Sequence, residues 1–303
     1  MTVDIRGIIT RGVGGLYDVK VTSDCDIHGS YVISTARGGI RNRKLTPAIG
    51  DTVDIAPTGD PDVPYIIEKI HDRKNILVRP PVANLSTLIL TFACMEPAPD
   101  LKLLDKMLII TSKLGIKPVI VFTKGDLDPG IITELYQIYK DCGYDVFMSS
   151  PEDMITYDKI KHSLLPGITG FAGPSGVGKS TLINSILDRE SMQTGQISDR
   201  LKRGKHTTRH VQLFELGDDY FVDTPGFTSL SLYELGIEYT DVTLGYPEIE
   251  ELSSGCRFDD CRHINETDCA VRGSIDQGRY ERYKEFYEEL YSLRNTYVGR
   301  LRK

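Results

Sequence analysis

The 303-residue sequence lacks any apolar run close to the roughly 20 residues that cross a bilayer. Its first ten residues, MTVDIRGIIT, lack the charged segment, apolar core and cleavage site of a secretory signal. No low-complexity tract is present, and 40% of the residues are hydrophobic and 26% charged. These features predict a globular, cytoplasmic protein with no membrane partner and with two or three domains.

Cysteine is also scarce, and acidic residues outnumber basic ones by 43 to 36. Six cysteines in a chain of this length do not indicate a disulfide framework, and three of them cluster late in the sequence. The net charge of −7 argues against binding nucleic acid by bulk electrostatics, so any RNA contact must come from local patches. Two basic patches are candidates, although taken alone each patch favours a solvated loop: Arg37, Arg41, Arg43 and Lys44, and residues 200–210.

The first 73 residues contain short runs that alternate or are rich in β-branched residues, with Gly, Asp and Pro clusters between them. The five runs are residues 4–10, 15–22, 30–35, 51–57 and 64–70. Closely spaced strands without a convincing helix predict a small β-barrel, for which the OB type is the natural candidate. Such a barrel binds RNA or serves only for packing, and both readings stay open here.

Strands and helices then alternate over residues 74–231. The expected strands are 85–94, 118–123, 145–150, 167–173, 211–216 and 219–226, and the expected helices 103–115, 131–143, 152–165 and 179–187. This alternation predicts a doubly wound α/β domain with a mostly parallel sheet.

A phosphate-binding loop stands between an expected strand and an expected helix. The segment GPSGVGKS matches G-x-x-x-x-G-K-[ST] at every fixed position. Backbone N–H groups of such a loop surround phosphate oxygens. The lysine reaches the β- and γ-phosphates and stabilises the negative charge that develops there during the reaction. The serine holds Mg²⁺. The predicted nucleotide-binding residues are Gly173, Pro174, Ser175, Gly176, Val177, Gly178, Lys179, Ser180 and Thr181.

Two further segments complete the predicted phosphate site. DTPG ends a strand downstream, where Asp223 can hold the Mg²⁺ water shell and the Gly226 N–H can sense the γ-phosphate. Between the loop and DTPG lies GKHTTRH, in which Thr208, or else its neighbour Thr207, can complete the Mg²⁺ shell.

The segment TKGD follows the strand at 118–123 and predicts guanine recognition. Asp126 can accept two hydrogen bonds from the N1–H and exocyclic amine of guanine, which adenine cannot supply. Lys124 would lie over the base, and Thr123 would support the phosphate loop by hydrogen bonding. Ser149 and Ser150 would line the base-binding site from the next strand. A P-loop ATPase is the rival reading, and it predicts that Asp126→Asn leaves activity unchanged.

The guanine elements precede the phosphate loop, which is a circular permutation of the usual GTPase order. Permutation is tolerated when the original termini lie close together at the surface. The segment after DTPG then leads directly into a separate C-terminal domain, and we expect movement at the nucleotide to pull on that domain.

The C-terminal domain, residues 232–303, contains Cys256-x4-Cys261-x-His263-x5-Cys269. Three thiolates and one imidazole satisfy tetrahedral Zn²⁺ and leave no position for water, so a structural zinc site is predicted. The polar sequence around it can hardly form a core unaided, so the metal would supply folding energy. A helix at 279–294 places Tyr280, Tyr283, Tyr287 and Leu290 on one face, which indicates core packing.

These motifs together resemble the circularly permuted GTPases RsgA/YjeQ, which act in maturation of the small ribosomal subunit. The resemblance extends over nearly the whole chain, from LVRPPVANLSTLIL through TKGD, GPSGVGKSTLIN, GKHTT and DTPGF to the cysteine cluster and GRYERYKEFYEEL. It implies an OB-fold, a permuted GTPase domain and a helical zinc domain, all contacting the small subunit. It also implies GTP hydrolysis to GDP and phosphate that the subunit stimulates and that accompanies release of late assembly factors.

Two positions bear on the catalytic prediction. Thr123 stands where the family more usually has Asn, which bears on nucleotide affinity. Phe227 stands where Ras-type GTPases have a water-orienting Gln, so intrinsic hydrolysis should be slow. The resemblance implies that His206, docked by the ribosome, positions the water, although a solvated loop histidine is the alternative.

The overall prediction is a monomeric Mg²⁺-dependent GTPase of the small subunit and its rRNA. Basic residues of the 200–210 segment suit rRNA phosphates: Arg200, Lys202, Arg203, Lys205 and Arg209. The alternative is a GTP-controlled RNA-binding switch with a non-ribosomal partner.

Overall fold

The structure, a computed structural model, describes residues 5–38, 46–149, 154–194, 211–224 and 231–294. Among these, no helix is long and apolar enough to cross a membrane. The described residues form two compact units. One draws on residues 1–87, 165–171 and 185–227, and the other on residues 88–164, 172–184 and 228–303.

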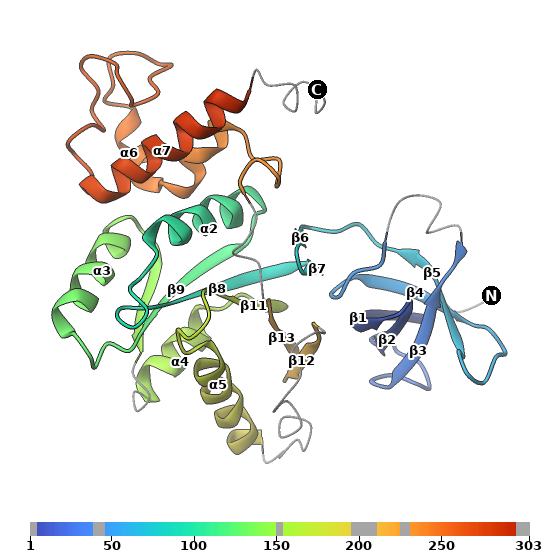
Figure 1. The fold of residues 1–303 in the computed structure, drawn as a ribbon. Helices are drawn as coiled ribbons and strands as arrows, with labels where there is room; N and C mark the ends of the chain where they lie inside the picture. Colours follow the sequence, from blue (N-terminus) through green and yellow to red (C-terminus); the bar gives the residue numbers. More distant parts are fainter. Residues whose placement is uncertain (1–4, 39–45, 150–153, 195–210, 225–230, 295–303) are drawn as a thin grey trace. The chain divides into compact units, whose positions relative to one another are not determined.

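A closed five-stranded barrel occupies the N-terminal part of the chain (Figure 1). Its strands are β1 (Ile5–Val13), β2 (Leu16–Val21), β3 (Tyr31–Ala36), β4 (Thr52–Pro57) and β5 (Tyr65–Ile70). They follow the order β1-β2-β3-β5-β4, with β3 and β5 parallel and the other described pairs antiparallel. Alternate residues point inward and form the core: Ile9, Val19, Val21, Val53, Ile55 and Ile67. The predicted OB-type barrel is confirmed.

A short hairpin that the sequence analysis did not predict follows the barrel. It consists of β6 (Ile76–Val78) and β7 (Pro81–Ala83), three residues each. Strands this short carry too little alternation to be recognised from sequence.

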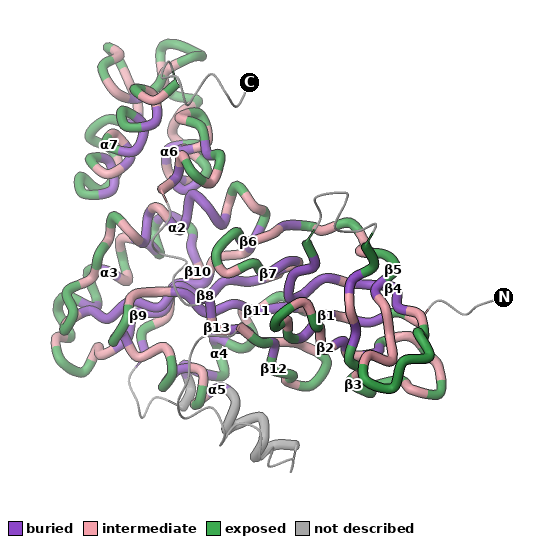
Figure 2. The backbone as a smooth tube through the Cα atoms, turned by 45° about the vertical axis from the view of Figure 1, so that its right-hand side comes forward, coloured by how far each residue is buried: buried purple, intermediate pink, exposed green. Residues whose placement is uncertain are grey.

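The central sheet has six strands in the order β10-β9-β8-β11-β13-β12. Their bounds are β8 (Leu85–Ala93), β9 (Lys117–Thr123), β10 (Asp145–Ser149), β11 (Ile168–Ala172), β12 (Leu213–Leu216) and β13 (Asp219–Asp223). The pairs β9–β10 and β11–β13 are parallel, and the edge strand β12 is antiparallel to β13. β8 and β9 are almost wholly buried, as near-continuous apolar runs predict for strands covered on both faces (Figure 2).

Four helices accompany the sheet: α2 (Leu101–Lys113), α3 (Pro129–Asp141), α4 (Met154–Ser163) and α5 (Lys179–Thr194). α2 and α3 lie on one side of β9 and β10, and α4 lies on the other (Figure 1). Asp100 begins α2 by accepting a hydrogen bond from the Leu103 N–H, and Asp128 begins α3 in the same manner. The predicted doubly wound α/β architecture is confirmed.

The C-terminal part contains the 3-10 helix η3 (Tyr239–Gly245), α6 (Pro247–Ser253) and α7 (Gln277–Leu293). α7 matches the predicted helix, and its Tyr280, Tyr283, Tyr287 and Leu290 are buried as expected. η3 and α6 were not predicted, because seven residues present at most two turns of helical periodicity.

Candidate nucleotide site and metal centre

Residues 173–178 form a loop between β11 and α5, and Lys179 and Ser180 are the first residues of α5, as predicted. Gly173 has a φ of +147°, and a Cβ at this position would lie 2.1 Å from the Thr91 carbonyl oxygen, so only glycine fits. The Lys179 ammonium donates to the carbonyls of Gly173 (2.8 Å) and Pro174 (2.5 Å), which holds it over the loop. Four candidate residues are exposed on this loop and the first turn of α5: Ser175, Gly176, Ser180 and Thr181. The positive end of α5 therefore faces an open loop, which suits an anion.

Thr123, the last residue of β9, is bonded directly to this loop. Its buried hydroxyl donates to the Val177 carbonyl at 2.5 Å. On the neighbouring strand β10, Ser149 is paired in register with Thr123 and is also buried. The carboxyl ends of β9 and β10 thus place both residues at one edge of the sheet, where open α/β sheets bind ligands.

Lys124 is held in a left-handed turn by residues that follow β8. Its φ is +58°, and its carbonyl accepts a hydrogen bond from the Cys94 thiol at 2.9 Å. The Cys94 N–H donates to the Thr123 carbonyl at 3.0 Å, and the Lys124 ammonium donates to the Glu96 carbonyl. Burial raises the pKa of Cys94, which keeps the thiol protonated and able to donate. This role of Cys94 could not be predicted from the sequence, since a single buried cysteine belongs to no motif.

Asp126 and Asp128 follow with different surroundings. Asp126 is exposed. The Asp128 carboxylate accepts hydrogen bonds from the N–H groups of Gly130 (2.9 Å) and Ile131 (3.1 Å) at the start of α3. Asp128 is therefore a helix cap, whereas Asp126 is exposed and remains the predicted guanine-binding carboxylate.

Asp223 ends β13 and is paired in register with Phe171 of β11, two residues before Gly173. The neighbouring Thr224 donates through its hydroxyl to the Phe171 carbonyl at 2.8 Å. Five other candidates lie outside the described residues: Ser150, His206, Thr207, Thr208 and Gly226. The same holds for Phe227, for the 200–210 segment and for most of the first basic patch, of which Arg37 alone is described and pairs with Glu68 at 2.9 Å.

We expect Thr123→Val to weaken GDP and GTP binding without changing base preference. The change keeps the side-chain shape but removes the donor to the Val177 carbonyl, which costs about 1 to 3 kcal/mol when that acceptor is buried, or roughly 5- to 150-fold in affinity. Thr123→Ser keeps the hydroxyl and should bind nearly as the parent does. Fluorescent-nucleotide titration measures both variants, and equal affinity for Val and Ser would contradict the role of the bond.

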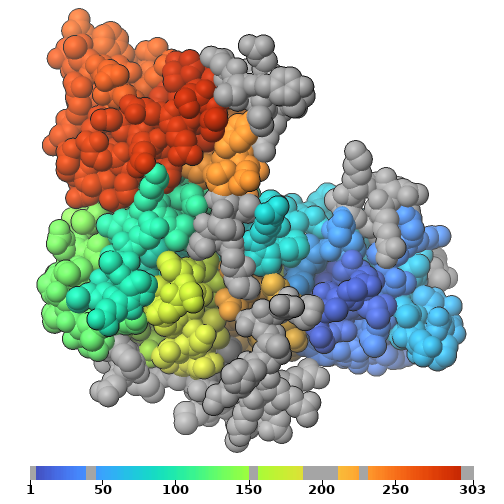
Figure 3. Space-filling model, viewed as in Figure 1, coloured from blue at the N-terminus to red at the C-terminus, as the bar shows by residue number. Residues whose placement is uncertain are grey.

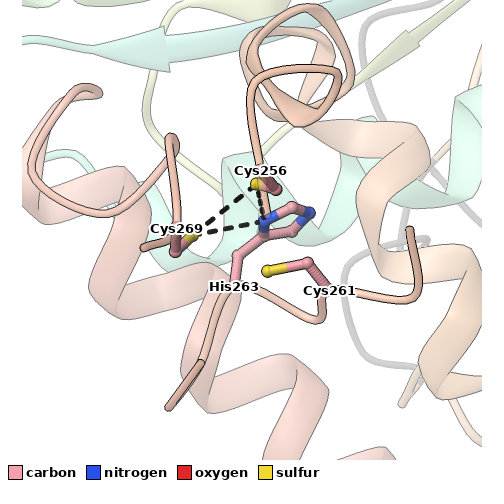
Figure 4. Close-up of side chains that lie close together, drawn as sticks. All are labelled: Cys256, Cys261, His263 and Cys269. Carbon is pink, nitrogen blue, oxygen red and sulfur yellow. Dashed lines mark hydrogen bonds between the residues drawn. The ribbon is translucent and has the colours of Figure 1, made fainter. Parts of the chain in front are cut away.

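The four predicted metal ligands converge in the C-terminal part (Figure 4). The atoms Cys256 Sγ, Cys261 Sγ, His263 Nδ1 or Nε2 and Cys269 Sγ all lie within 4.8 Å of one another. Nδ1 of His263 lies 3.5 Å from the sulfurs of Cys256 and Cys269, which are 4.0 Å apart. None of the six cysteines forms a disulfide.

These separations fit a tetrahedral site. With Zn–S bonds of about 2.3 Å and Zn–N bonds of about 2.0 to 2.1 Å, tetrahedral edges are roughly 3.8 Å between sulfurs and roughly 3.6 Å from sulfur to nitrogen. His263 is buried, and burial lowers its pKa, which favours the neutral imidazole that ligates metal. The donor set and its spacing therefore fit a structural metal ion.

Helix α7 holds the ligand loop in place. Its Tyr280 hydroxyl donates to the His263 carbonyl at 2.8 Å, and its Tyr283 hydroxyl donates to the Arg262 carbonyl at 2.9 Å. The aromatic residues of α7 are thus part of the core, as predicted, and the hydroxyls of Tyr280 and Tyr283 also position the loop of the candidate metal ligands. The helical spacing of the tyrosines predicts which face of α7 is buried. It does not predict which groups the tyrosine hydroxyls contact.

Comparisons with known proteins agree with the order and geometry of these elements. The family model for the RsgA GTPase matches residues 70–233, and the model for the RsgA N-terminal domain matches residues 6–63. The chain belongs to the RsgA GTPase family. The resemblance noted from the sequence is confirmed, and this RsgA-family protein is a GTP hydrolase.

Relatives align with this RsgA-family chain over almost their full length. A protein from Agathobacter rectalis named small ribosomal subunit biogenesis GTPase RsgA is 40% identical over 298 residues, covering 94% of this chain and 98% of the relative. The protein of that name from Bacillus anthracis is 38% identical, covering 96% and 99%.

Two solved structures share the fold. YloQ, described as a circularly permuted GTPase, matches with a TM-score of 0.77 and 29% identity over 98% of each chain. YjeQ from Thermotoga maritima matches with a TM-score of 0.75 and 29% identity, covering 95% of this chain and 99% of that one. The predicted circular permutation is confirmed, because TKGD at the end of β9 precedes the phosphate loop after β11.

Proposed function

We propose that this GTPase acts in late maturation of the small ribosomal subunit as a cytoplasmic monomer that binds rRNA. The observation that carries the proposal is the alignment of relatives named small ribosomal subunit biogenesis GTPase over 94–96% of the chain. The subunit stimulates hydrolysis of GTP to GDP and phosphate, and hydrolysis times a late assembly step. GDP, GTP and the subunit are then the partners of the protein.

The reaction is in-line attack of water on the γ-phosphate. The amides of the 173–180 loop and the Lys179 ammonium stabilise the developing charge, and Asp126 orients the base with Thr123, Lys124, Ser149 and Ser150 around it. Mg²⁺, when bound through Ser180 and Thr208 with Asp223 at its water shell, supplies further positive charge to the phosphates. Gly226 senses the γ-phosphate, and His206 positions the water once the subunit docks it.

The barrel supplies a surface suited to rRNA. Leu16 on β2 and Tyr31 and Ile33 on β3 are large apolar residues that are 43–46% exposed. β2 and β3 are antiparallel neighbours, and Lys20 of β2 stands opposite Tyr31. This face of an OB-type barrel binds oligonucleotides by stacking bases on aromatic rings.

In the C-terminal part, the Cys256, Cys261, His263 and Cys269 cluster holds one Zn²⁺. Its role is structural, because four protein ligands leave no open position for substrate or water. The spacing of the ligand atoms supports this proposal.

GTP turnover by the purified protein, with and without small ribosomal subunits, tests the proposed function. We expect a large stimulation, at least about 100-fold, by small subunits and none by large subunits, since the chain lacks a water-orienting Gln after DTPG. GTP binding without stimulation by either subunit would contradict the proposal and favour a GTP-controlled RNA-binding switch with another partner. His206→Ala should abolish the stimulation while leaving GTP affinity unchanged.

A further inference from the structure

A fully buried arginine joins the C-terminal part to helix α2. Arg279, near the start of α7, is 0% exposed. Its guanidinium donates to Asp105 Oδ1 of α2 at 2.6 Å, to Glu248 Oε1 of α6 at 2.6 Å and to the Gly245 carbonyl at 2.8 Å. Arginine is the residue whose rigid fork can serve three acceptors at once.

The Asp105 carboxylate is equally buried and has four donors. Besides Arg279, it accepts from Arg282 Nε at 2.5 Å, the Tyr139 hydroxyl at 2.8 Å and the Tyr246 hydroxyl at 3.3 Å. Burial would lower the pKa of Arg279, but Asp105 and Glu248 raise it well above its usual value, so the guanidinium stays charged. The two positive charges of Arg279 and Arg282 are therefore balanced by the two negative charges of Asp105 and Glu248 inside the fold.

Aromatic rings close this cluster. The guanidinium carbon of Arg279 lies 4.4 Å from the ring centre of Tyr246, 5.0 Å from that of Tyr139 and 5.9 Å from that of Tyr144. A Cβ on Gly245 would lie 2.8 Å from the Ile109 nitrogen, so η3 touches the backbone of α2. Figure 3 shows the C-terminal part lying directly against α2 and α3. Because this contact is buried, charged and hydrogen-bonded, its geometry is set within narrow limits.

The first turn of α2 borders the phosphate loop. A cavity of about 210 Å³ is lined by Asp100 and Leu103 of this turn and by Pro174 and Val177 of the loop. A second cavity of about 320 Å³ is lined by the same Asp100 and Leu103 and by Leu232 and Phe286 of the C-terminal part. Leu103 and Asp105 are two residues apart, so one helix borders the candidate nucleotide site and contacts the C-terminal part.

We propose that α2 couples the nucleotide site to the metal-bearing C-terminal part, with Asp105, Arg279 and Arg282 as the positioning residues of that coupling. This route is separate from the chain segment that follows DTPG. It rests on the cavity that α2 shares with the phosphate loop and on the buried contact of α2 with the C-terminal part, and it goes beyond the proposed ribosomal function. Nucleotide binding orders the loop against the first turn of α2, and the ion cluster transmits that order to α7. By thermodynamic reciprocity, an ordered α7 raises nucleotide affinity by the same factor.

Hydrogen exchange of the full-length, metal-loaded protein with and without GDP tests the coupling. In the parent protein, GDP should slow amide exchange at least 3-fold both in the 173–180 loop and in α7. Arg282→Gln removes one charge at the edge of the cluster, where the side chain is 15% exposed. This variant should keep the GDP effect in the loop, lose it in α7 and bind GDP at least 3-fold more weakly.

Glu285→Gln is the matched control, because Glu285 pairs with Lys102 between the same two helices but is 56% exposed. It should behave as the parent in both measurements. Should Arg282→Gln fail to fold, as judged by thermal unfolding and metal content, Asp105→Asn replaces it. The proposal is wrong if GDP leaves α7 exchange unchanged in the parent protein, or if the cluster variant and Glu285→Gln behave alike. Neither readout uses ribosomes, so failure here is distinct from failure of the proposed function.

Discussion

Asp126→Asn is expected to lower GDP affinity by roughly 150- to 25,000-fold and to create a preference for xanthine nucleotides. Asp126 is exposed at the turn after β9, where its carboxylate can accept two hydrogen bonds from guanine. Hydrogen bonds to a charged group contribute about 1.5 to 3 kcal/mol each, so losing two costs about 3 to 6 kcal/mol. Asparagine offers one donor and one acceptor, which matches the N1–H and the 2-oxo group of xanthine instead.

Competition of GDP, XDP and ADP for a fluorescent nucleotide measures this change. Asp128→Asn is the matched control, because Asp128 caps α3 and asparagine caps a helix about as well as aspartate. It should retain guanine preference. Unchanged GDP affinity in Asp126→Asn would contradict the role of Asp126 in guanine recognition. It would favour the alternative prediction of a P-loop ATPase, in which Asp126 does not contact the base.

Removing the metal is expected to unfold the C-terminal part of the chain. The ligand loop around Cys256, Cys261, His263 and Cys269 is polar, and its main described anchors are the Tyr280 and Tyr283 hydroxyls of α7. Structural zinc contributes on the order of 10 kcal/mol in small zinc domains, more than the whole stability of many domains. A strong chelator or Cys261→Ser should therefore expose α7 to proteolysis, with loss of helical signal by circular dichroism.

Cys25→Ser is the control for the metal prediction, since Cys25 lies in the barrel, remote in sequence from the cluster. It should retain one metal ion per chain and the resistance of α7 to protease. Atomic absorption or a colorimetric zinc assay gives the stoichiometry. A chelated protein with α7 still protected would contradict a structural role for the metal.

Several features of this protein could be predicted from sequence because their signals are local. The phosphate loop, TKGD and the cysteine cluster each lie within fourteen residues or fewer, so spacing alone carries their chemistry. The five barrel strands and the strand–helix alternation show as hydrophobic periodicity, which needs no knowledge of partners. The chain order of these motifs was enough to predict the circular permutation that the comparisons confirm.

Only the tertiary structure decided which distant side chains meet. Thr123 donates to Val177, 54 residues away, and Arg279 pairs with Asp105, 174 residues away. Arginine is almost never fully buried unless it is paired, and no sequence motif indicates the partners of Arg279. The direction of a long polar side chain depends on what packs around it, and packing joins residues without regard to their separation in the chain. For that reason the sequence determined the motifs and their chemistry, whereas the fold alone determined that α2 borders the phosphate loop and contacts the C-terminal part, which contains the cysteine cluster.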